Sequence, residues 1–127
     1  MPSIAMLIGR ILLSLIFIQA AISKLVDVSG TIAYFQGLGM LLPSVTIWLV
    51  ILVELVGGLM ILTGFYTRIA ATVLALFCIA TAFIGHSNWS NITDFQAFMK
   101  DIAISGGLLY VAAAGAGIIS LDTRRGV

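Results

Sequence analysis

Residues 43–85 decide the fold, and they read PSVTIWLVILVELVGGLMILTGFYTRIAATVLALFCIATAFIG. Only two charged residues, Glu54 and Arg68, occur in this stretch. About 20 consecutive apolar residues in a helix cross the roughly 30 Å hydrocarbon core of a bilayer. The stretch therefore predicts two membrane spans, 44–64 and 67–85. Since only two residues separate these spans, the helices are expected to form a tight antiparallel hairpin.

Apolar segments on either side of this hairpin predict two further spans. Residues 4–23 are apolar apart from Arg10 and Gln19, and residues 102–121 contain no charge. Residues 11–18 could also be the apolar core of a secretory signal peptide. We prefer a span, because three further spans give this segment something to pack against. The chain is thus expected to be all-α, an integral membrane four-helix bundle with a single transmembrane domain over residues 1–127.

The composition agrees with a membrane protein and excludes several classes of function. Hydrophobic residues make up 61% of the chain and charged residues 9%, against roughly 25% charged residues in soluble domains. The net charge of +1 gives no clustered basic surface for a nucleic acid. Cys78 and His86 are the only cysteine and histidine, which excludes an internal disulfide and bis-His haem ligation and disfavours a tightly bound metal. Cys78 is expected to be a small packing residue.

The positive charges predict the orientation of the bundle. With four spans both termini lie on the same side. That side carries Arg10, Arg68, Arg124 and Arg125, against Lys24 and Lys100 on the other. Because cytoplasmic loops are enriched in Lys and Arg, both termini are expected in the cytoplasm. The loops 24–43 and 86–99 would then face outward. In the first loop, a short helix capped by Ser29 and ended by Gly37 is predicted.

Arg10 and Glu54 are the charged residues that lie deepest in the predicted spans. An ionisable side chain near the bilayer centre costs about 2.5–3.5 kcal/mol on insertion scales, so it is usually paired, turned inward or functional. Counting about 1.5 Å per residue from the span midpoints places both residues at a similar depth. The sequence therefore predicts a buried ion pair between them. A proton-titratable or substrate-binding role for Glu54 stays open. Arg68 lies further from the centre and is expected at the interface.

A group of polar residues lies near the outward ends of three spans. Its members are Gln19, Lys24, His86, Lys100 and Asp101. Together they could line an outward-facing polar pocket, in which His86 could exchange a proton near neutral pH. The alternative is that they are interfacial anchors and loop caps without a joint role.

Short motifs follow one another along nearly the whole chain. They are GR at 9–10, SKL at 23–25, GLG at 37–39, ELVGG at 54–58, GFYTRIAA at 64–71, KDIA at 100–103, GGL at 106–108 and SLD at 120–122. In order and spacing the chain resembles the DoxX family of small membrane proteins. Asp101 departs from the resemblance, because asparagine is expected there in many relatives. An acid beside Lys100 would neutralise it, which puts a shared anion-binding role for Lys100 in doubt.

The resemblance implies a location in the bacterial inner membrane and a role in redox or sulfur metabolism close to quinone. Some family members resemble membrane subunits of thiosulfate:quinone oxidoreductases, and others are associated with superoxide dismutase or sulfurtransferase partners. The leading hypothesis is a quinone-proximal subunit or membrane anchor in such an assembly. Quinone is the only cofactor considered, with its carbonyls at Lys24, His86 or Lys100. Because no redox-cofactor motif is present, the chemistry would come from protein partners.

Two other functions and two further properties stay open. A small proton-coupled transporter also has four spans and an intramembrane glutamate, although an arginine counter-charge at Glu54 would argue against free proton exchange. A structural assembly factor without catalysis is the third hypothesis. Neither the formation of a homo-oligomer nor an enzymatic activity of the chain itself is decided by the sequence.

Overall fold

The computed structural model describes residues 2–124 and 126, and the described chain is helical without strands, as predicted. Its long helices are α1 (Pro2–Val26), α3 (Pro43–Thr63), α4 (Thr67–Gly85) and α5 (Ile92–Ala114), and its short ones are α2 (Val28–Gly37) and α6 (Leu121–Arg124). All four long helices are long and apolar enough to cross a membrane. Arg125, one of the arginines behind the predicted orientation, lies outside the described residues.

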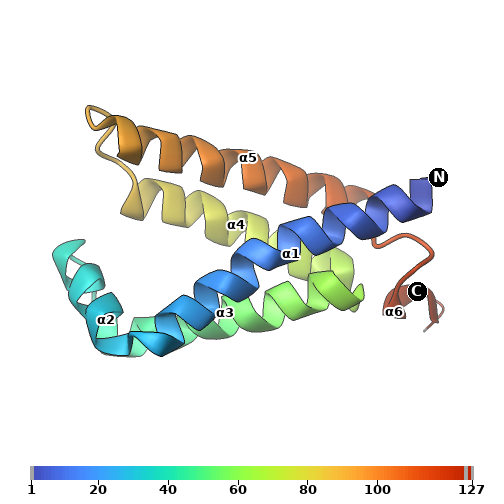
Figure 1. Ribbon diagram of the computed structural model, residues 1–127, viewed down its shortest axis with the longest axis horizontal. Helices are drawn as coiled ribbons and strands as arrows, with labels where there is room; N and C mark the ends of the chain where they lie inside the picture. Colours follow the sequence, from blue (N-terminus) through green and yellow to red (C-terminus); the bar gives the residue numbers. More distant parts are fainter. Residues whose placement is uncertain (1, 125, 127) are drawn as a thin grey trace.

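The long helices form two antiparallel pairs, α1 with α3 and α4 with α5 (Figure 1). Figure 1 shows both termini and the α3–α4 turn at one end of the molecule. The α4–α5 loop and α2 lie at the other end, where the two pairs are further apart. We call these the inner and the outer end. The backbones of the two pairs thus diverge from the inner end toward the outer end.

The predicted hairpin of the second and third spans is confirmed. α3 ends at Thr63 and α4 begins at Thr67, so the turn is as short as the sequence indicated. Gly64 and Tyr66 both adopt left-handed backbone conformations, with φ of 71° and 46°. A side chain at Gly64 would clash with Arg10 and Ser120. Glycine is therefore required for both its conformation and its lack of a side chain.

The fourth span begins and ends earlier than predicted, at Ile92 and Ala114 instead of 102 and 121. Its start is capped by Asn91, whose side chain accepts hydrogen bonds from the backbone N–H groups of Thr93 and Asp94. The predicted span 102–121 was limited to residues without charge, but a helix can begin in the polar region outside the bilayer. The outer loop is correspondingly shorter than 86–99, and Lys100 and Asp101 lie within α5.

α2 is the short helix predicted in the first loop. It ends at Gly37 as expected, but Asp27 caps it instead of Ser29, by accepting a hydrogen bond from the backbone N–H of Gly30 at 3.1 Å. Phe35 of α2 is buried with Ala21, Ile47 and Ile51. This apolar cluster holds α2 against α1 and α3 at the outer end.

Small residues along α4 allow the close packing of the core. Ala71 and Ala75 are fully buried and Cys78 nearly so, in one cluster with Phe17 of α1 and Leu108 of α5. Helices in lipid associate through such small residues because the backbones can then approach each other. The prediction that Cys78 is a packing residue is confirmed.

We expect the inner end to face the cytoplasm, because the arginines are concentrated there. In a Cys78→Ala background, a cysteine at Thr123 should react with a membrane-impermeant thiol reagent only from the cytoplasmic side, and one at Ser90 only from the outside. Both positions are exposed, and they lie at opposite ends of the molecule. Labelling of both cysteines from the same side would contradict the orientation and the four-span topology together.

Candidate functional site: a cavity at the outer end

Glu54 is buried in the middle of α3 and pairs with Lys24, not with Arg10. The Nζ atom of Lys24 lies 2.8 Å from Oε1 of Glu54, whose residue is only 5% exposed. The predicted Arg10–Glu54 ion pair is therefore wrong. Arg10 instead donates from Nη1 to the backbone oxygen of Ile61 at 3.2 Å and from Nη2 to that of Ile119.

The packing of α1 on α3 explains this exchange of partners. A Cβ atom on Gly58 would touch Phe17 and Ile18, so these residues face each other across the two helices. Because the helices are antiparallel, moving from Gly58 back to Glu54 corresponds to moving forward along α1, toward Lys24. Arg10 lies level with the end of α3 by the same argument. There the last carbonyl groups lack helical partners and attract a cation.

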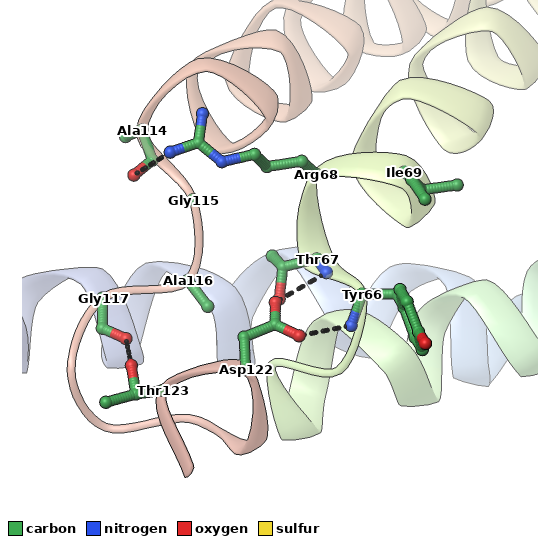
Figure 2. A pocket seen from close by; sticks show the side chains of 10 residues that line it. All are labelled: Tyr66, Thr67, Arg68, Ile69, Ala114, Gly115, Ala116, Gly117, Asp122 and Thr123. Carbon is green, nitrogen blue, oxygen red and sulfur yellow. Dashed lines mark hydrogen bonds between the residues drawn. The ribbon is translucent and has the colours of Figure 1, made fainter. Parts of the chain in front are cut away.

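Two other charged groups at the inner end, Arg68 and Asp122, also hold helix termini (Figure 2). Arg68 is exposed and donates to the backbone oxygens of Ala112, Ala113 and Ala114 at the end of α5. Asp122 accepts from the backbone N–H groups of Tyr66 and Thr67 at 2.6 and 2.8 Å, at the start of α4. A cavity of about 390 Å³ lies among these residues. Its charged groups already serve the helix ends, so we regard this end as structural.

Asp122 could not be found from the sequence. Its carboxylate caps a helix that begins 55 residues earlier in the chain, whereas recognisable capping residues directly precede their helix. Only the path of residues 115–120 back across the inner end brings it there (Figure 2).

A second cavity, of about 410 Å³, opens between the helix pairs at the outer end. We call it the outer cavity. Its lining comes from α1 to α4 and the residues next to them, and consists of Lys24, Tyr34, Phe35, Leu38, Met40, Val50, Glu54, Phe77, Ala80, Thr81, Ile84, Gly85 and His86. Small-molecule sites typically enclose about 300–1,000 Å³ and combine apolar walls with a few placed polar groups. The outer cavity has this character, with the Lys24–Glu54 pair as its charged part.

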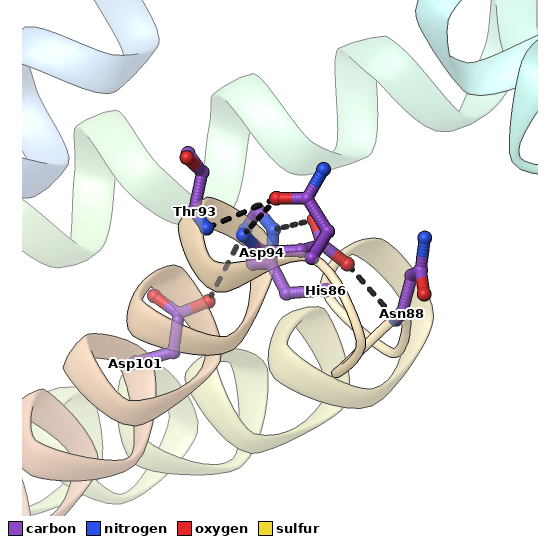
Figure 3. Close-up of polar contacts among 6 residues, drawn as sticks. His86, Asn88, Thr93, Asp94 and Asp101 are labelled. Atoms are coloured by element: carbon purple, nitrogen blue, oxygen red, sulfur yellow. Dashed lines mark hydrogen bonds and ion pairs between the residues drawn. The ribbon is translucent and has the colours of Figure 1, made fainter.

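His86, which follows α4, is flanked by two acidic side chains (Figure 3). Its Nδ1 lies 3.4 Å from Oδ1 of Asp94, and its Nε2 lies 3.7 Å from Oδ2 of Asp101. Asp94 is itself held by the backbone N–H of Asn88 at 2.9 Å. Both ring nitrogens thus face carboxylates of α5. Among the residues that the structure describes, no cluster of His, Cys, Asp or Glu could hold a metal ion.

The outer cavity brings together only part of the predicted outer pocket. Lys24 and His86 line it, and Glu54 joins them. Asp101 contacts His86 without lining the cavity. Gln19 is exposed and donates to the hydroxyl of Ser23 at 2.8 Å, and Lys100 is exposed on α5 and also outside the lining. Membership of this site was misjudged because the sequence gives the level of a residue along its helix but not the side that it faces.

The fold and the cavity define a small membrane protein of four spanning helices with one polar site between its helix pairs. The profile of the DoxX family matches residues 5–87. The chain belongs to the DoxX family.

Two relatives cover almost the whole chain. Inner membrane protein YqjF of Escherichia coli is 40% identical over 96% of this chain and 92% of its own length. Inner membrane protein YphA of the same organism is 33% identical over 95% of this chain and 90% of its own. Together with the four apolar helices, these relatives make the chain a multi-pass protein of the inner membrane.

A third relative covers only part of the chain. The Bacillus subtilis protein named "Putative oxidoreductase CatD" is 34% identical over 58% of this chain and 53% of its own length. No solved structure matches the chain.

Proposed function

We propose that the chain is a membrane subunit of a redox assembly, and that its outer cavity binds the head group of a quinone-class molecule. One observation carries this proposal. A cavity of small-molecule size between the helix pairs has apolar walls and an ion pair, Lys24–Glu54, whose carboxylate is buried. A quinone head group requires these two features together, an apolar slot for its ring and a polar group at its oxygens.

The walls of the outer cavity suit a flat ring. Phe35 and Phe77 lie on different sides of it, from α2 and α4, and Leu38, Met40 and Val50 are apolar. Aromatic rings prefer offset or edge-on neighbours and gain about 0.5–1.5 kcal/mol per pair beyond burial. These side chains can therefore hold a ring by contact alone.

The polar groups of the outer cavity can bind oxygen atoms. The ammonium group of Lys24 has three N–H donors, and on one side it contacts Glu54. The remaining donors can reach a ligand oxygen. Tyr34 also lines the cavity, and its ring is 52% exposed. His86 contributes less to such binding than we expected from the sequence, because its two nitrogens face Asp94 and Asp101.

A role as a subunit, with the chemistry in a partner, fits the residues that the chain supplies. The described residues hold no cluster for a metal, and the one cysteine is buried in the core, so we assign electron transfer to a partner protein. The name of the CatD relative, an oxidoreductase, agrees with a redox setting.

Binding of a short-chain quinone analogue to the detergent-purified protein tests the proposal. Lys24→Met should weaken binding by about tenfold or more, because a hydrogen bond from a charged donor contributes about 1.5–3 kcal/mol. Ala80→Phe, which enlarges a side chain of the cavity lining and leaves the residues of the ion pair unchanged, should also abolish binding. Equilibrium dialysis at constant detergent concentration would give the dissociation constants.

Two matched controls lie outside the cavity. Lys100→Met removes an exposed lysine, and Ala103→Phe enlarges an exposed alanine on α5. Both should leave the affinity within about twofold of wild type, as expected for surface changes. Equal affinity in all variants, or uptake no greater than partition into the detergent, would exclude the quinone site and favour an assembly factor without a ligand.

A further inference from the structure

Glu54 has one oxygen that the protein leaves without a partner. Oε1 lies 2.8 Å from Lys24, although that contact lacks regular hydrogen-bond geometry. Oε2 has neither a hydrogen bond nor an ion pair with any residue that the structure describes. Glu54 lines the outer cavity while only 5% exposed. Oε2 can therefore accept a hydrogen bond from a ligand in the cavity.

The missing partner must be a hydrogen-bond donor. A carboxylate can only accept hydrogen bonds, and Glu54 is placed as a carboxylate in an ion pair with the ammonium group of Lys24 at 2.8 Å. The carbonyl oxygens of an oxidised quinone also only accept, so one of them placed against Oε2 would add repulsion. The hydroxyl groups of the reduced form, the quinol, donate.

We infer that the outer cavity selects the reduced form of its ligand, with a quinol hydroxyl donating to the free oxygen of Glu54. This inference rests on the proposed function, since it names the redox state that the same cavity prefers. A hydroxyl group is both donor and acceptor. It can therefore donate a hydrogen bond to Glu54 and accept one from Lys24. A carbonyl oxygen can only accept the hydrogen bond from Lys24.

The other ionisable groups near the cavity do not compete for this role. Lys24 is the only charged group within ion-pair distance of Glu54 among the described residues. Asp94 and Asp101 flank His86, and neither belongs to the cavity lining. Glu54 is thus the one carboxylate available to a ligand hydroxyl in the cavity.

Selective binding of the reduced form would change the redox behaviour of the bound ligand. Quinone and quinol differ by two electrons and two protons. For a two-electron couple, each tenfold preference for the reduced form raises the midpoint potential by about 30 mV. The bound quinone would then accept electrons more readily than free quinone, as a site that receives electrons from a partner protein requires.

The test compares the two redox forms of one short-chain quinone, under anaerobic conditions and at a single pH. The wild-type protein should bind the quinol at least about tenfold more tightly than the quinone, because a site that hydrogen-bonds a ligand hydroxyl rejects an analogue that lacks it. Glu54→Gln provides both a donor and an acceptor, so its ratio of affinities should fall close to one. Lys100→Met should keep the wild-type ratio.

A blocked ligand keeps the test independent of how well the variant folds. The dimethyl ether of the quinol has the same ring and oxygens but no donor, and the wild-type protein should bind it no better than the quinone. Equal affinity for quinol and quinone, tighter binding of the quinone, or tight binding of the ether would overturn the inference. If neither redox form binds beyond detergent partition, the proposed function itself fails, and the two failures are thus distinguishable.

Discussion

Replacement of Arg10 by glutamine is expected to lower the midpoint of thermal unfolding of the purified protein by roughly 10 °C. Arg10 is 2% exposed, and its guanidinium group donates to the backbone oxygens of Ile61 and Ile119. It thereby joins α1 to the end of α3 and to the C-terminal segment. Each hydrogen bond from a charged group contributes about 1.5–3 kcal/mol, and about 1 kcal/mol shifts the midpoint by roughly 3 °C in a chain of this size.

Arg124→Gln provides the matched control for this measurement. Arg124 is an exposed arginine on α6, at the same end of the molecule. Its replacement should change the midpoint by no more than about 2 °C, because surface substitutions usually alter stability by less than about 0.5 kcal/mol. A similar decrease in both variants would show that the loss of positive charge at the inner end matters, and not the contacts of Arg10.

The second large effect is expected at the Lys24–Glu54 pair. Removing one partner of a fully buried ion pair typically costs about 3–5 kcal/mol, because the other charge stays buried without compensation. The loss here should be smaller, because the side chain of Lys24 is 21% exposed. Lys24→Met and Glu54→Gln should therefore each destabilise the protein. The double variant should lose less than the sum of the two, with a coupling energy of about 0.5–3 kcal/mol. The coupling energy is obtained by measuring the free energy of unfolding of the wild type, the two single variants and the double variant in one detergent.

Arg10 provides the comparison that separates the predicted ion pair from the observed one. If Arg10 and Glu54 do not interact, the losses of unfolding free energy caused by Arg10→Gln and Glu54→Gln should add to within about 0.3–0.5 kcal/mol in the double variant. Their partners lie at different levels of α3, one beside Lys24 and one at Ile61. The opposite result would contradict our assignment. In that case the stability losses of the Lys24 and Glu54 variants would add, those of the Arg10 and Glu54 variants would be coupled, and the predicted Arg10–Glu54 pair would be correct.

Local signals in the sequence were sufficient to predict the number and approximate positions of the long apolar helices. The apolar runs predicted four of them, and the short linker at residues 65 and 66 predicted the hairpin of α3 and α4. Such signals depend on neighbours in the chain and on the thickness of the bilayer, so they can be read without knowledge of the packing. The boundaries of α5 were less accurate, because its first turns carry Asp94 and lie outside any charge-free window.

The partners of the charged residues could not be read in this way. The depth count assumed that the midpoints of the first two spans lie side by side. The contact of Gly58 with Phe17 and Ile18 shows a different alignment of α1 and α3. That shift moves Lys24 next to Glu54 and Arg10 to the end of α3. Depth within a span is therefore not enough to assign an ion pair.

By itself the sequence determined the number of spans, their approximate positions, the hairpin between α3 and α4, and which polar residues would be costly to leave unpaired. Hydropathy and helix length are local properties, and the bilayer imposes them on each segment separately. Only the tertiary structure decided that Lys24 pairs with Glu54, that Asp122 caps α4, and that Lys24, Glu54 and His86 share one cavity. Those contacts depend on how helices are shifted and rotated against each other, and this is set by the packing of small residues between distant parts of the chain.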